Sequence, residues 1–109
     1  MRIRYVRERN TNMNDFDYVN SCTFEGFVSS PIINKGNKVT FSIRFPSDVY
    51  KNSYVEIDCV AYNNLALIIE ATVGKDDKVY IISSCVSEPS TFFVVHKLFI
   101  LQKKIQNNI

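Results

Sequence analysis

Apolar and polar residues alternate along residues 54–62. The positions on one side of this alternation are apolar or small, namely Val55, Ile57, Cys59 and Ala61. The positions between them are mostly polar or aromatic, namely Tyr54, Glu56, Asp58 and Tyr62. A period of two residues is typical of a strand that buries one face. We therefore predict a half-buried strand over residues 54–62.

Four further segments have the character of strands. Residues 38–45 alternate most cleanly, and residues 19–29 and 78–86 also alternate. Residues 91–102 are apolar on both faces, as expected where a strand also meets a subunit partner. Residues 64–72 are apolar without alternation and predict a short buried helix, which a charged turn at residues 75–77 follows.

The order of these elements is three strands, one helix and two strands. This order is typical of a five-stranded OB-fold barrel, so we predict an all-β chain with a helix between the third and fourth strands. Parallel strands or a helical majority would contradict this prediction. The predicted core consists of Phe24, Val39, Phe41, Ile43, Ile57, Cys59, Leu65, Ile68, Val79 and Ile81.

Gly26 lies in the middle of the first predicted strand. Glycine inside a strand commonly marks a bulge or a sharp bend, and a small barrel needs such a bend to close. Pro31 and the Asn-Lys-Gly sequence at residues 34–36 then predict a reversal of the chain before the second strand.

The size of the chain allows one domain. With 109 residues and 46% hydrophobic residues, it can bury a single modest core, which we assign to residues 19–102. Residues 103–109 are predicted to be a short polar tail. Residues 1–18 are predicted to be a flexible basic arm, with arginine at positions 2, 4, 7 and 9, that either contacts phosphates or is a solvated end.

No segment has the composition of a membrane span. The longest apolar run extends from Leu65 to Ile69, whereas a span requires roughly 20 residues. The first residues also lack the apolar segment and small-residue cleavage site of a signal peptide. We therefore expect a cytoplasmic protein without a membrane partner.

Residues that could support catalysis or metal binding are scarce. The three cysteines have none of the short spacings of metal sites, and Cys22 and Cys59 fall on the predicted core face. His96, the single histidine, has no nucleophile or orienting carboxylate at a suitable spacing. We expect no enzymatic activity, no cofactor and no metal.

Aromatic residues are the most informative group, because phenylalanine and tyrosine make up 13% of the chain. Single-strand binding proteins stack bases on flat side chains, each stack contributing about 1–3 kcal/mol, and place cations along the phosphates. The candidate stacking residues are Tyr62, Tyr54, Phe27 and Tyr80, and the candidate cations are Arg44, Lys35, Lys38 and Lys51. The alternative is that these aromatic rings pack against another subunit or the helix.

Four blocks of the sequence resemble the bacterial single-stranded DNA-binding (SSB) proteins, namely residues 19–31, 38–45, 55–66 and 78–86. The Val19-Asn20 pair, Gly26 and Pro31 match the opening of the first strand and its loop in that family. Tyr62, followed by Asn63-Asn64-Leu65-Ala66, matches the aromatic residue that stacks on DNA in that family. The resemblance extends over roughly residues 19–101 and implies single-stranded DNA as the partner.

The chain departs from the family pattern at three places. Glu56 stands where the family often has a tryptophan, and together with Asp58 it puts carboxylates on the expected DNA face. The loop at residues 87–90 is shorter than in typical members. The family's acidic tail tip is also missing, so recruitment of repair enzymes by that route is not expected.

The sequence leaves two functions open. One is a homo-oligomeric protein, dimer or tetramer, that coats single-stranded DNA in replication, recombination or repair, with RNA as a possible ligand. The other is an interaction module that helps to assemble a replication complex, as in primosomal replication protein B. Residues 71–74 and 78–79 resemble that branch of the family.

Overall fold

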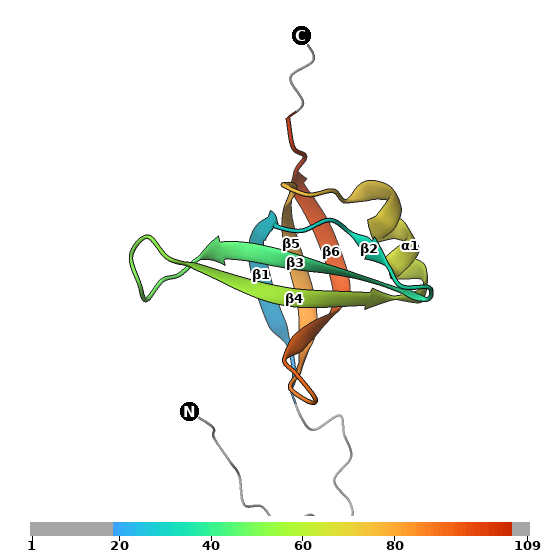
Figure 1. Cartoon of the computed structure of the whole chain (residues 1–109), viewed down its shortest axis with the longest axis horizontal. Coiled ribbons are helices and arrows are strands. Elements are labelled where there is room, and N and C mark those ends of the chain that lie inside the picture. The colour runs from blue at the N-terminus through green and yellow to red at the C-terminus, as the bar shows by residue number, and fades with distance from the viewer. Residues whose placement is uncertain (1–18, 106–109) are drawn as a thin grey trace, which may run out of the picture.

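The computed structural model describes residues 19–105, so the basic arm predicted at residues 1–18 and the end of the tail lie outside the described residues. Residues 19–105 form six strands and one helix (Figure 1). In chain order these are β1 (Cys22–Val28), β2 (Ile33–Asn34), β3 (Lys38–Pro46), β4 (Tyr54–Tyr62), α1 (Asn63–Thr72), β5 (Lys78–Val86) and β6 (Phe92–Gln102). No helix in this part of the chain is long and apolar enough to cross a membrane.

The strands form a closed ring. Neighbouring strands follow the order β1-β5-β6-β4-β3-β2, and β1 also pairs with β3. The five long strands therefore close on themselves, with α1 packed beside one end of β3 and β4 (Figure 1). The predicted OB fold is confirmed. Only β2 was not predicted, because its two residues are too short to show alternation.

One strand pair runs parallel. β4 pairs with β6 in the parallel direction through Cys59 opposite Phe93 and Val60 opposite Val94. The expectation of no parallel strands is therefore wrong at this pair. The chain leaves β4 through α1 and returns through β5, and such a long connection lets two neighbouring strands run in the same direction.

The core follows the predicted alternation with one exception. The predicted side chains that are buried are Val39, Phe41, Ile43, Ile57, Cys59, Val79 and Ile81, and Phe24 and Leu65 are partly buried against them. Ile68 was predicted in the core, but its side chain is 58% exposed. The buried side of α1 consists of Ala66 and Ile69, and Ile68 lies outside this narrow stripe.

Gly26 lies where the backbones of β1 and β3 approach each other. A Cβ atom at this position would lie 2.6 Å from the Arg44 carbonyl oxygen and 2.8 Å from Ile43 Cγ2. The pairing of β1 with β5 continues past Gly26 without a register shift, so no bulge occurs here. The glycine instead permits β1 to contact β3 and close the barrel, through Phe27 opposite Arg44 and the next pair.

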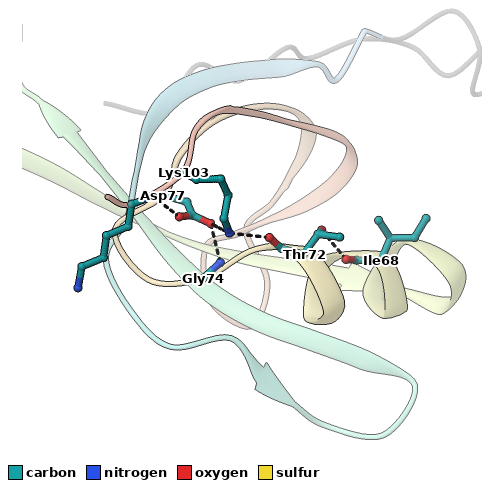
Figure 2. A network of polar contacts seen from close by, with 6 residues as sticks. Ile68, Thr72, Gly74, Asp77 and Lys103 are labelled. Atoms are coloured by element: carbon teal, nitrogen blue, oxygen red, sulfur yellow. Dashed lines mark hydrogen bonds and ion pairs between the residues drawn. The ribbon is translucent and has the colours of Figure 1, made fainter. Parts of the chain in front are cut away.

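Asp77 is buried, although the sequence predicted a charged turn at this position. Its side chain accepts hydrogen bonds from the backbone N–H groups of Gly74 and Lys104, both at 2.8 Å, and from Lys103 Nζ at 2.5 Å (Figure 2). The same Nζ donates to the Thr72 carbonyl oxygen at 2.8 Å, at the end of α1. Asp77 therefore joins the end of α1 to the segment that follows β6.

Candidate nucleic-acid interface

The outer face of the β3–β4 pair carries half of the predicted binding residues. Because β3 and β4 are antiparallel, residues directly opposite each other project to the same side. Along this outer face the pairs are Lys38 with Tyr62, Thr40 with Val60, Ser42 with Asp58, Arg44 with Glu56 and Pro46 with Tyr54. The intervening residues point inward, which explains why alternation located this face correctly.

Tyr62 and Lys38 occupy the end of this face next to α1. Tyr62 is the last residue of β4 and the N-cap position of α1, and its side chain is 38% exposed. Lys38 lies directly opposite it on β3. A flat ring beside an ammonium group is the arrangement with which proteins bind a base and its phosphate.

Arg44 and Tyr54 occupy the other end of the face. The Arg44 guanidinium carbon lies 4.7 Å from the centre of the Tyr54 ring, which is a cation–π contact. Phe27 of β1 is paired with Arg44, and its side chain is 47% exposed. The second end therefore combines two aromatic rings with one cation.

The two ends are well separated. Arg44 is opposite Glu56, and the six residue steps from Glu56 to Tyr62 correspond to roughly 20 Å along a strand. Tyr62 and Arg44 lie on neighbouring strands as predicted, but they are not adjacent. A single nucleotide cannot contact both side chains.

Two acidic residues of β4 also lie on this face, Glu56 opposite Arg44 and Asp58 between the two ends. Glu56 accepts a hydrogen bond from Ser29 Oγ at 2.8 Å, and Asp58 accepts one from Ser42 Oγ at 3.1 Å. Both carboxylates are exposed, so this part of the face repels phosphate. Beside it is a hollow of about 430 Å³, and Lys35 and Asp58 are both among the residues that line it.

Tyr80 belongs to a different surface. It lies on β5 opposite Glu25 of β1, and its ring centre is 6.2 Å from that of Phe99. Phe99 is an exposed aromatic residue that was not among the stacking residues predicted from the sequence. Residues 91–102 are apolar on both faces, and register shifts in the β5–β6 pairing change which residues face outward.

The loop between β3 and β4 carries Lys51 at an exposed position, far from α1 in the barrel (Figure 1). Tyr50 beside it is 70% exposed and was also missed. Alternation identifies outward-facing residues only within strands, and Tyr50 lies in a turn. The signal that could have located it is the Tyr-Lys pair itself, an aromatic residue next to a cation.

Cys59 and His96, two side chains of types that can take part in catalysis, lie within β4 and β6. Burial, and to a lesser degree the charge of Asp58, raises the pKa of the Cys59 thiol to about 12, so this thiol stays protonated at neutral pH. The His96 Nε2 atom lies 2.6 Å from Ser84 Oγ. Within residues 19–105, no three His, Cys, Asp or Glu side chains gather in a way that could hold a metal ion.

Comparisons with known proteins show similarity in structure. No family model and no curated protein matches the sequence. The mitochondrial single-stranded DNA-binding protein Rim1 from S. cerevisiae is 12% identical with a TM-score of 0.70, covering 79% of this chain and 97% of that chain. A small single-stranded DNA-binding protein from Mycoplasma pneumoniae is 17% identical with a TM-score of 0.64, and the match covers 84% of this chain and 97% of that chain.

A third solved structure, the SSB domain of a Synechococcus sp. protein, is 15% identical with a TM-score of 0.65 and covers 74% of this chain and 94% of that chain. All three comparisons include most of both chains. The chain therefore has the fold of the single-stranded DNA-binding domains, as the resemblance in sequence implied.

Proposed function

We propose that this protein binds single-stranded DNA without catalysis, through base stacking and phosphate contacts, and so coats exposed strands in replication, recombination or repair. The observation that carries this proposal is the exposed Tyr62 ring beside Lys38 at the end of the β3–β4 face. The proteins that share the fold support it, because their names state single-stranded DNA binding.

The remaining predicted residues extend this site in two directions. Arg44, Tyr54 and Phe27 form a second contact region roughly 20 Å away, and Lys51 lies in the loop beyond it. A strand that uses both regions crosses the acidic centre with its bases, rather than its phosphates, toward Glu56 and Asp58. Tyr80 lies outside this path, on the β1–β5 surface.

Replacing Tyr62 by alanine should weaken binding to oligo-dT by about 1–3 kcal/mol, because a base loses its stacking surface. The dependence of affinity on salt should not change, since no phosphate contact is lost. Fluorescence anisotropy at several salt concentrations measures both quantities. Tyr62→Phe is the matched control, because it keeps the ring, and circular dichroism checks the fold.

Replacing Arg44 by alanine should act differently, because it removes a phosphate contact. The slope of log affinity against log salt should become shallower by about 0.7, the value for one phosphate on a single strand. Lys75, in the exposed loop after α1, provides a control cation, and Lys75→Ala should leave the slope unchanged. Parallel titrations with oligo-U and duplex DNA compare the affinity for single-stranded DNA with the affinities for RNA and for duplex DNA.

The alternative function is an OB-fold module that assembles a replication complex. It is favoured by an apolar groove between α1 and β6, lined by Leu65, Ile68, Ile69, Thr72, Leu98, Phe99 and Ile100. If Tyr62→Ala and Arg44→Ala leave oligo-dT binding unchanged but disturb assembly, this function replaces DNA coating.

Self-association is expected from the same groove. Ile68 and Phe99, which both line it, are each more than half exposed, and such grouped apolar surface is typical of interaction sites. Light scattering at micromolar concentration should report a dimer or tetramer, and Ile68→Asp should shift it toward the monomer. A monomeric wild-type protein would contradict this prediction.

A further inference from the structure

A second hollow lies between the β2–β3 turn and the beginning of α1. Its volume is about 300 Å³, at the lower limit of the roughly 300–1,000 Å³ of small-molecule sites. It is lined by Asn34, Gly36, Asn37, Val39, Asn63, Asn64, Ala66, Leu67 and Glu70. The lining therefore combines four asparagines and one glutamate with the apolar residues Val39, Ala66 and Leu67.

One of these asparagines is already used within the protein. Asn34 Oδ1 accepts a hydrogen bond from the Gly36 N–H at 2.7 Å, and its Nδ2 donates to Glu70 Oε2 at 2.9 Å. The side chains of Asn37, Asn63 and Asn64 form no hydrogen bond with other residues in the described part of the chain. Each carries both donor and acceptor atoms, so they can form hydrogen bonds with the edge of a ligand.

The two sides of the hollow are fixed relative to each other. The Asn63 N–H donates to the Asn37 carbonyl oxygen at 3.0 Å, which joins the start of α1 to the turn. The turn itself is closed by the Lys35 N–H, which donates to the Lys38 carbonyl oxygen at 2.8 Å. The backbone on both sides of the hollow is therefore already ordered, which lowers the entropy cost of binding a ligand.

The hollow opens next to the proposed stacking site. Tyr62 directly precedes Asn63, and Lys38 lies between two lining residues and opposite Tyr62. A strand with one base stacked on Tyr62 and its phosphate on Lys38 therefore brings a neighbouring base to the hollow. Glu70 disfavours a phosphate there but accepts hydrogen bonds from an amino group.

We propose that this asparagine-lined hollow binds one unstacked nucleobase whose Watson–Crick edge presents an exocyclic amino group beside a ring nitrogen that accepts a hydrogen bond, namely adenine or cytosine, in preference to thymine. The amino group donates to Glu70 or to an amide oxygen, and an amide N–H donates to the ring nitrogen. Thymine presents a carbonyl oxygen where these bases present the amino group. The proposal rests on the proposed single-strand binding and adds base selectivity to it.

The test compares a short oligo-dT with the same oligomer carrying one dC, one dA or one abasic site at its centre. The wild-type protein should bind the dC or dA oligomer about fivefold more tightly than oligo-dT, the lower limit for a base contact with two hydrogen bonds. The oligomer with the abasic site should bind no more tightly than oligo-dT.

Two variants remove the free amides independently. Asn63 has a φ of 56°, so Asn63→Gly deletes the amide and keeps this backbone conformation accessible, and Asn64→Ala removes a neighbouring amide. Both should lose the preference and keep the affinity for oligo-dT. The matched control is Asn52→Gly, because Asn52 has a φ of 64° and lies in the distant β3–β4 loop. It should keep the preference.

The outcomes separate the two proposals. Equal affinities of wild-type protein for all the oligomers, or retention of the preference by both Asn63→Gly and Asn64→Ala, overturns base selectivity and leaves single-strand binding intact. Absence of binding to every oligomer overturns both proposals. A correctly folded protein in each case is confirmed by circular dichroism.

Discussion

Replacing Asp77 by alanine is expected to lower the free energy of unfolding by about 3 kcal/mol. The side chain is 2% exposed, and the substitution leaves the N–H groups of Gly74 and Lys104 without this acceptor. It also removes the ion pair with Lys103, which connects β6 to the end of α1. Urea denaturation followed by circular dichroism measures the change.

The neighbouring aspartate provides the control. The Asp76 side chain is 51% exposed, and it forms an ion pair with Lys104 at 3.4 Å. Such surface pairs contribute about 0–1 kcal/mol, so Asp76→Asn should change the free energy of unfolding only slightly. Asparagine is the suitable replacement because it tolerates the positive φ of this position. Equal losses for Asp77→Ala and Asp76→Asn would contradict a special role for the buried carboxylate.

The contribution of Asp77 should depend on pH. Burial raises the pKa of this carboxyl, but hydrogen bonds from Lys103, Lys104 and Gly74, with the Lys103 charge, outweigh burial and hold the pKa below its ordinary value. Because the pKa is lower in the folded state, the ionised carboxylate stabilises the protein at pH values above the unfolded-state pKa of about 3.9. This stabilisation is lost as the pH falls through the folded-state pKa. The difference in stability between wild type and Asp77→Asn should therefore shrink in acid.

Replacing Gly26 by alanine should cost about 1–3 kcal/mol or more of unfolding free energy, the range for overpacking a closed core. The added Cβ atom would lie 2.6 Å from the Arg44 carbonyl oxygen, which belongs to the backbone and cannot rotate away. Either β1 must separate from β3, which opens the barrel, or both strands must shift. Thermal and urea unfolding measure the loss.

Gly74→Ala is the matched control for this substitution. A Cβ atom at Gly74 would meet only Asp77 Oδ2, at 3.9 Å, an ordinary van der Waals distance. Its effect should stay within about 0.5 kcal/mol, as for most substitutions without a specific clash. If Gly26→Ala proves as stable as Gly74→Ala, the contact between β1 and β3 is not close.

Alternation in the sequence was enough to predict the buried face of every long strand except β6, which is apolar on both faces. Alternation is a local property, because successive side chains of a strand project to opposite sides whatever the strand pairs with. It therefore placed Ile57 and Cys59 inside and Tyr62, Tyr54 and Arg44 outside. Alternation could not show that Tyr62 and Arg44 lie at opposite ends of the face, because this depends on the register between β3 and β4.

Features that involve segments distant in the sequence depend on how the barrel closes. Ile68 is apolar but exposed, because the small area of α1 that touches the barrel is filled by Ala66 and Ile69. Asp77 is charged but buried, because Lys103, 26 residues later, reaches its carboxylate. The hydrophobic pattern reflects how often each residue type is buried in proteins in general. Whether a particular side chain is buried depends on the partners that the closed barrel brings to it.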